Sequence, residues 1–274
     1  MFACVRKDRL MTRTGSPYLA LELRDRTGTI AARAFRDADA LAGRFERGDL
    51  VFVAGRVERF RDELVLELLE ISRANADGSV DPEQFLPSAY RDLDELEGFL
   101  EYLAREVYHR AYRTVLDQLL DDSELRAGLR RAPCTRAGHH AYLGGLLEHT
   151  VAVTQLACEA CQLHRRLNSD LLLTAAIVHD LGLIRVFSYG AEIGLTDEGR
   201  LLGHLALGQE MLLARCAGLD SERRLALLHC VLSHHGPAST PGGRFALPEA
   251  LALYRINQLD ASVKGALEAG TELH

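Results

Sequence analysis

Two adjacent side chains that can bind metals end an apolar helical run in the middle of the chain. Leu173, Ala176, Ile177 and Asp180 recur at the i, i+3, i+4, i+7 spacing of one helix face, and His179 precedes the aspartate. A carboxylate on an apolar face must be paired or metal-bound, because burying a bare charge costs too much free energy. The dipeptide also occurs by chance at helix ends, so its interpretation depends on the rest of the chain.

More histidines, and a second aspartate, fall on apolar faces of the neighbouring predicted helices. A single histidine in such a place is usually a hydrogen-bonded core residue. Five histidines and two aspartates on five successive helices would rarely arise independently, so metal binding is the better interpretation. The predicted ligands are His149, His179, Asp180, His204, His234, His235 and Asp260.

These seven side chains are enough for two divalent ions that share Asp180 as a bridge. Mixed histidine and carboxylate ligands suit manganese, iron, cobalt, nickel or zinc better than magnesium or calcium. Two ions about 3.5–4 Å apart can clamp both the attacking and the leaving oxygen of a phosphoryl transfer. The first ion would be held by His149, His179, Asp180 and Asp260, and the second by Asp180, His204, His234 and His235.

Helical periodicity predicts an all-α domain over residues 91–274 that positions these ligands. A bundle can bring side chains from facing helices to one point. Asp92 is the expected cap of its first helix, and the ligands fall on helices expected at 141–165, 169–181, 203–217, 221–235 and 247–268.

Residues 1–72 instead alternate apolar and polar side chains in the manner of strands. Five strands with a helix at 37–45, between the third and fourth, are the element order of an OB-fold barrel. Residues 73–90 contain Gly and Pro and are predicted to be a linker. The expected fold class is therefore multidomain α+β, a small N-terminal OB-fold β-barrel followed by an all-α helical bundle.

Barrels of this kind bind single strands through basic and stacking aromatic side chains. An alternative is that the aromatic residues belong to the core or rim and that the arginines form a solvated face. The expected partner is single-stranded RNA or DNA. The candidate contacts are Arg13, Tyr18, Arg33, Phe35, Arg56, Arg59, Phe60 and Arg61.

Charge separates the two parts of this 274-residue chain, whose net charge is −7. Residues 1–75 hold 14 basic and 12 acidic side chains, about +2, and the remainder holds 18 and 27, about −9. An acidic domain binds phosphate backbones poorly unless metal cations neutralise its site.

No apolar run is long enough to span a membrane, and charges come too early at the N-terminus for a signal peptide. We therefore expect a cytoplasmic protein with reduced thiols. Cys158 and Cys161 form a CxxC pair without a second pair, which we interpret as structural.

The motifs resemble those of the HD-domain phosphohydrolases and, more narrowly, the YhaM-type 3′-5′ exoribonucleases, in which an OB-fold precedes the HD domain. The motifs are HHAYLGGLLEHT at 139–150, HD at 179–180, GRLLGH at 199–204, LSHHG at 232–236 and LDA at 259–261. The resemblance covers nearly the whole chain. It implies metal-dependent removal of nucleotides from a 3′ end, usually with manganese, in the bacterial cytoplasm.

One residue departs from the motif, because Leu183 stands where the family usually has lysine. That lysine is a plausible phosphate contact, and Arg185 is close enough in sequence to replace it. The resemblance also implies that His139 or His140 contacts the scissile phosphate or donates a proton, beside Asp180 as the third catalytic candidate. The alternative is that both histidines brace the start of a helix.

Three functions remain open at this point. The first is a two-metal 3′-5′ exonuclease that trims single-stranded RNA, or DNA. The second is a phosphodiesterase of small nucleotides in which the barrel serves assembly, and the third is a nucleic-acid-binding module with an inactive site. The intact ligand set argues against the third, and the sequence leaves homo-oligomerisation open.

Overall fold

The computed structural model describes residues 1–74, 82–240 and 242–270. The chain forms two compact units, one of Met1–Pro87 with Ser188–Gly194, the other of Ser88–Phe187 with Leu195–His274. Residues 75–81 of the predicted linker lie outside the described residues.

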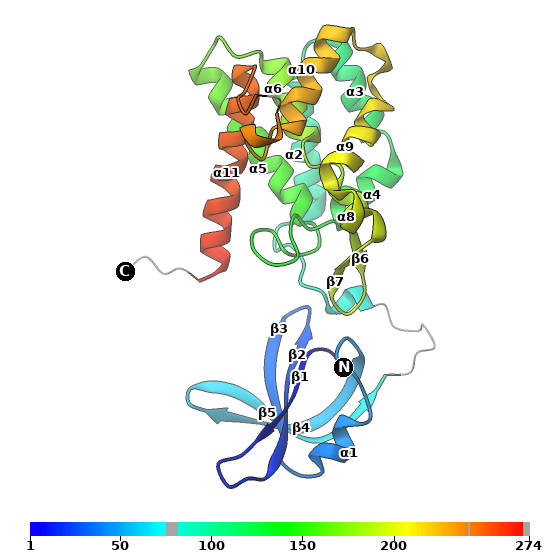
Figure 1. The fold of residues 1–274 in the computed structure, drawn as a ribbon, viewed down its shortest axis with the longest axis vertical. Coiled ribbons are helices and arrows are strands. Elements are labelled where there is room, and N and C mark those ends of the chain that lie inside the picture. Colours follow the sequence, from blue (N-terminus) through cyan, green and yellow to red (C-terminus); the bar gives the residue numbers. More distant parts are fainter. Residues whose placement is uncertain (75–81, 241, 271–274) are drawn as a thin grey trace. The chain divides into compact units, whose positions relative to one another are not determined.

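The first unit contains a closed five-stranded barrel (Figure 1). The strands pair in the order β1-β2-β3-β5-β4, with β3 and β5 parallel and the other pairs antiparallel. A helix between the third and fourth strands completes the predicted OB-fold order, which is confirmed. The elements are β1 (Phe2–Met11), β2 (Pro17–Asp25), β3 (Gly28–Ala34), α1 (Ala38–Ala42), β4 (Leu50–Phe60) and β5 (Glu63–Arg73).

Every second side chain along a strand points into the barrel and fills its interior. Leu19, Leu21 and Leu23 of β2 are buried inside it, and the residues between them face outward. At the bulge of β4, a Cβ on Gly55 would lie 2.2 Å from the carbonyl oxygen of Glu67, so only glycine fits there.

The second unit is a helical bundle, as predicted (Figure 1). Asp92 caps its first helix by accepting hydrogen bonds from the backbone N–H groups of Asp94 and Glu95. The helices are α2 (Leu93–Arg105), α3 (Arg110–Leu120), α4 (Ser123–Arg131), α5 (Gly145–Leu163), α6 (Ser169–Val178), α7 (Leu183–Val186), α8 (Asp197–Leu201), α9 (Gly203–Leu213), α10 (Ser221–Leu232) and α11 (Pro248–Glu268).

Some boundaries differ from the prediction. Helix α5 begins at Gly145 rather than 141, because Gly144 adopts a left-handed conformation with φ 81°. Helices α6 and α10 end before the histidines that we placed inside them. The prediction of an all-α domain also missed a hairpin of β6 (Phe187–Tyr189) and β7 (Ile193–Leu195), whose strands are too short to show a period of two.

Within the described parts of the chain, no helix is both long and apolar enough to cross a bilayer. Cys158 and Cys161 are free, half-buried thiols, and burial raises the pKa of Cys158 to about 11.

A close backbone approach holds the turn after α6 against the start of α9. A Cβ on Gly182 would lie 2.0 Å from the carbonyl oxygen of His204 and 2.5 Å from the nitrogen of Gly208. The turn that carries Asp180 and the helix that carries His204 therefore meet backbone to backbone.

We expect Gly182→Ala to lower the free energy of unfolding by about 1–3 kcal/mol, since an added methyl group would push two backbones apart. Gly98→Ala is the matched control, because nothing lies within 4 Å of the place that a Cβ would take on Gly98 in α2, and alanine favours a helix. Urea unfolding of both variants makes the comparison. Equal stability of Gly182→Ala and the parent protein would show that the two segments separate at no cost.

Candidate metal centre

Two of the predicted ligands are aimed by the ends of their own helices. His179 follows α6 and its Nδ1 lies 2.8 Å from the carbonyl oxygen of Ala176, while His234 follows α10 with its Nδ1 2.5 Å from that of Val231. Carbonyls in the last turn of a helix lack partners within the helix, and they accept here from the ring N–H. Each ring therefore carries its hydrogen on Nδ1 and turns the lone pair of Nε2 toward the interior.

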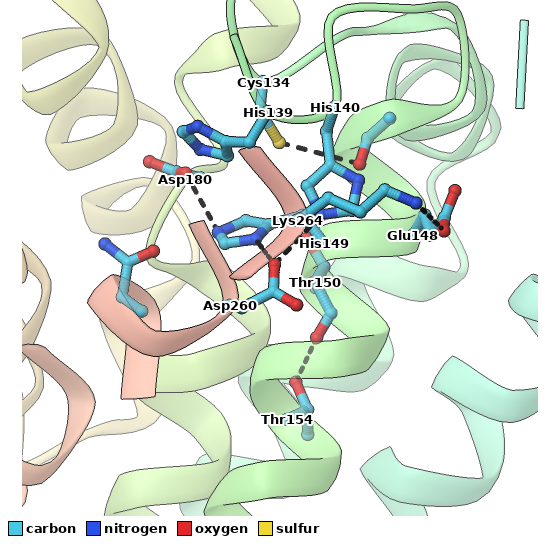
Figure 2. A network of polar contacts seen from close by, with 12 residues as sticks. Cys134, His139, His140, Glu148, His149, Thr150, Thr154, Asp180, Asp260 and Lys264 are labelled. Atoms are coloured by element: carbon cyan, nitrogen blue, oxygen red, sulfur yellow. Dashed lines mark hydrogen bonds and ion pairs between the residues drawn. The ribbon is translucent and has the colours of Figure 1, made fainter. Parts of the chain in front are cut away.

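His149 is oriented by a carboxylate instead of a carbonyl. It lies in the second turn of α5 and is fully buried, with Nδ1 2.6 Å from Oδ2 of Asp260 on α11. Figure 2 shows its ring between the carboxylates of Asp260 and Asp180. A carboxylate of this kind can only accept, so Nδ1 donates and Nε2 again presents a lone pair.

The carboxylate of Asp180 is surrounded by four imidazole Nε2 atoms. Its Oδ1 lies 3.2 Å from His234 and 3.6 Å from His204, and its Oδ2 lies 3.4 Å from His179 and 3.8 Å from His149. The two oxygens thus face two different pairs of histidines.

His235 extends one of these pairs. Its Nε2 is 2.8 Å from Nε2 of His204, and both belong with His234 and Asp180 to one group whose ligand atoms lie within 4.8 Å of one another. His149, His179 and Asp180 form a second such group. Asp260 falls in a third group, with His149 and His140, rather than beside His179.

The facing lone pairs indicate that a cation fits this cluster. The Nε2 atoms of His149 and His179 are 3.2 Å apart, yet each ring has its hydrogen committed to Nδ1. Two acceptors at this distance repel each other, whereas a metal ion would bind both.

Unpaired buried atoms lead to the same conclusion. Among the described residues, only three buried side-chain nitrogen or oxygen atoms lack a hydrogen-bond partner, and two of them are Oδ1 of Asp180 and Nε2 of His234. Buried polar atoms without partners are rare and need an explanation such as an ion. The residues present therefore fit a divalent metal.

Electrostatics keep the cluster ready to bind cations. Burial alone would raise the pKa of Asp180, but the adjacent imidazoles of His179 and His234 hold it well below its usual range. Burial lowers the pKa values of His149 and His204. Partial desolvation and the adjacent His234 lower the pKa of His235 to about 4, so this imidazole is neutral at pH 7 and keeps its lone pair.

A pocket of about 310 Å³ opens onto this cluster. His139 lines it, and burial together with His149 and His140 lowers its pKa. Its described lining includes neither lysine nor arginine. The lining residues are Cys134, Thr135, His139, Asp180, Leu183, His204, His235, Asn257, Gln258 and Ala261.

Arg185 is not the substitute for the missing lysine that we considered. Its guanidinium lies 2.5 Å from Glu198 and 3.2 Å from Glu210, and it is absent from the pocket lining. Leu183 is buried and gives the pocket an apolar wall.

Of the two adjacent histidines, only His139 reaches the pocket. His140 is 1% exposed, with Nε2 2.9 Å from Oδ2 of Asp260 and Nδ1 3.1 Å from the hydroxyl of Tyr142. The structure therefore gives it contacts inside the fold rather than with a substrate.

The barrel brings together five of its eight candidate nucleic-acid residues in two aromatic groups. Tyr18 and Phe35 stack with ring centroids 5.3 Å apart. The guanidinium carbons of Arg33 and Arg61 lie 4.8 and 5.4 Å from the ring centroid of Phe60. Phe35 and Phe60 are about half exposed. The other candidates are exposed arginines in the β1–β2 turn and on β4, namely Arg13, Arg56 and Arg59.

Sequence reasoning missed several polar residues of the site. Thr135, Asn257 and Gln258 line the pocket. Thr135 lies in a loop, where no periodic pattern exists, whereas Asn257 and Gln258 lie within α11 and received no role although Asp260 is close by on the same helix. Lys264 did have a signal, because it is four residues after Asp260 on the same face of α11.

Comparison with known proteins agrees with both parts of the chain. Residues 146–262 match the HD domain family, and residues 4–73 match an OB-fold nucleic acid binding domain.

Curated relatives described as 3′-5′ exoribonuclease YhaM match over 91% of this chain. That of Geobacillus sp. (strain WCH70) is 30% identical over 253 residues, 77% of its length. Those of Bacillus subtilis (strain 168) and Listeria monocytogenes serotype 4b (strain F2365) are 29% and 27% identical, each over 80% of its length. The chain belongs to the YhaM family, with an OB-fold ahead of an HD domain.

Proposed function

We propose that this protein is a metal-dependent 3′-5′ exoribonuclease that removes nucleotides from single-stranded RNA. The observation that carries the proposal is the ring of four Nε2 atoms around the buried carboxylate of Asp180. Its family relatives, named as exoribonucleases, and the aromatic and basic face of the barrel support the choice of substrate.

Two divalent ions, manganese first among the candidates, would be held on the two sides of Asp180. Oδ2 with His149 and His179 would hold one, and Oδ1 with the remaining three histidines would hold the other. Asp260 already accepts from His149 and His140 through Oδ2, so a metal bond from Asp260 would come from its other oxygen. When bound, the ions would supply positive charge for the phosphate and lower the pKa of a water molecule.

The pocket residues would position the 3′-terminal nucleotide. Because no lysine or arginine is part of the described lining, His139 is the side chain there that is best placed to donate a hydrogen bond to a phosphate oxygen. Thr135, Asn257 and Gln258 offer further hydrogen bonds to sugar or base. At about 310 Å³ the pocket is at the small end of ligand sites, which suits one terminal residue better than a continuous strand.

The barrel would hold the strand upstream of the site. The stacked pair Tyr18 and Phe35 and the arginine-flanked Phe60 offer aromatic faces for bases and charge for phosphates. DNA is a second substrate to be tested with the same residues, since stacking and phosphate contacts do not require a 2′-hydroxyl.

Degradation of labelled RNA tests the activity directly. With manganese present, RNA labelled at its 5′ end should give a ladder of ever shorter labelled products, because nucleotides leave from the 3′ end. RNA labelled at its 3′ end should release labelled mononucleotide at once. Hydrolysis of small nucleotides without any ladder would contradict the proposal and favour a phosphodiesterase of small substrates.

Asp180→Ala should abolish binding of both ions, because both groups of histidines share its carboxylate. We expect roughly two equivalents of metal per parent chain and close to none in the variant, measured by elemental analysis after gel filtration. Full occupancy in Asp180→Ala would rule out the shared-carboxylate arrangement.

His204→Ala should empty one position and leave the other bound. His204 contacts Oδ1 of Asp180 and His235, whereas the pair His149 and His179 does not include it. About one equivalent of metal should therefore remain, with turnover strongly reduced. Parent-like metal content and turnover would contradict the assignment of His204.

The combined variant Phe35→Ala and Phe60→Ala should weaken binding of long RNA much more than cleavage of a dinucleotide. Each stacked base is worth about 1–3 kcal/mol, so two lost platforms should raise KM for a long strand by at least tenfold. A dinucleotide has only one nucleotide beyond the one in the pocket, so it should lose little.

Phe52→Ala is the matched control, because Phe52 is a similarly exposed aromatic residue of the same barrel that stands outside both aromatic groups. The measurement is kcat/KM for a dinucleotide and a long oligonucleotide. Equal losses on both lengths would show that the barrel aromatics support folding rather than holding the strand.

A further inference from the structure

A buried polar network adjoins the metal centre, and His140 lies at the middle of it (Figure 2). Oδ2 of Asp260 lies 2.9 Å from Nε2 of His140 and 2.6 Å from Nδ1 of His149. Both nitrogens must donate, since a carboxylate with such partners only accepts. One oxygen atom therefore links the ring of His140 to the ring of His149.

The ring of His140 is itself fixed from its other side. Nδ1 is 3.1 Å from the hydroxyl of Tyr142, and that hydroxyl donates to Oε2 of Glu148 at 2.9 Å. Glu148 precedes His149 on α5, so the chain of contacts returns to the helix that carries the ligand. Lys264 then joins α11 to this carboxylate, with its Nζ 2.9 Å from Oε1.

The backbone of His140 is held as firmly as its ring. Its N–H donates to Oε2 of Glu268 at 2.9 Å, and its carbonyl accepts from the N–H of Cys134 at 3.0 Å. Its φ of 49° lies in the left-handed region, which a non-glycine residue adopts only when its surroundings impose it. A Cβ on Gly145 would lie 2.2 Å from the same carbonyl, so this glycine is what lets the loop sit against the start of α5.

We propose that His140 is a positioning residue, which acts on the metal centre through Asp260 and so fixes the tautomer and direction of His149. With Nδ1 of His149 held as a donor, Nε2 stays a lone pair aimed at His179. Without His140, the carboxylate of Asp260 loses one of its two donors and can rotate. His149 then loses its fixed partner and can present either nitrogen to the centre. Only the kinetic test of this inference rests on the proposed function, whereas the tests of metal affinity and of the histidine tautomer do not.

His140→Leu is the direct test, and His140→Gln is the conservative variant whose amide keeps an N–H donor for Asp260. Loss of a partner that orients a ligand typically weakens metal affinity about 10–100-fold. We expect that loss in His140→Leu for the ion on the His149 side, measured by competition between manganese and a chelator. His140→Gln should recover much of the affinity, which a purely space-filling role would not explain.

Kinetics separate positioning from substrate contact. His140→Leu should lower kcat at saturating manganese and leave KM for RNA nearly unchanged, because the residue does not line the pocket. His164→Leu, an exposed site at the other end of α5, is the matched control and should behave as the parent. A rise in KM alone would overturn the proposal, as would parent-like metal affinity in His140→Leu.

A readout on the metal-free protein remains valid if the RNA activity itself is absent. Nitrogen-15 spectra of the histidine rings should show His149 as the Nδ1–H form in the parent and as a mixture of forms in His140→Leu. Tyr142→Phe removes a single hydroxyl and serves if the leucine variant does not fold. It should shift the same signals in the same direction and by less, with Tyr102→Phe, an exposed tyrosine, as its control. Unchanged His149 signals in both network variants would refute the role of His140.

Discussion

The structure of the helical unit depends on one buried carboxylate that faces histidines instead of a permanent positive charge. Asp180 is 7% exposed, and the four nitrogens around it all belong to imidazole rings. A charge in such a place is costly unless it is paired, and imidazoles carry no permanent positive charge. Oδ1 of Asp180 and Nε2 of His234 are buried without a hydrogen-bond partner, which reflects the same lack of positive charge. A divalent cation bound at this cluster would supply the missing positive charge.

The scaffold achieves this geometry mainly with helix ends. His179 and His234 each use a carbonyl three residues earlier, in the last turn of their helices, to fix the hydrogen on Nδ1. Helix ends are suited to this task because their carbonyls are otherwise without partners. His149 sits inside a helix, where no such carbonyl exists, and takes its partner from Asp260 on α11. The polar network around His140 holds the carboxylate of Asp260 that orients His149.

The two parts of the chain differ in charge. The helical part is acidic overall, and the described lining of its pocket contains neither lysine nor arginine. Under the proposed function it would need bound metal ions to attract a polyanion. The barrel has arginines beside exposed aromatic rings, which suits a strand that must be held without reading its sequence. Leu183 strengthens this difference, since the position faces the pocket and provides apolar surface instead of charge.

The sequence by itself predicted the two architectures and the histidines and aspartates that the structure brings together in one cluster. Strand alternation in residues 1–72 and histidines on successive apolar helix faces were enough, because both are local periodic patterns that burial enforces. The tertiary structure decided matters that depend on distance between helices. It placed Asp260 against Nδ1 of His149, gave His139 and not His140 to the pocket, and committed Arg185 to Glu198. It also revealed the hairpin of β6 and β7, whose short strands carry no period. Spacing along a chain shows which face a side chain occupies, but only packing fixes which atom of that side chain meets its partner.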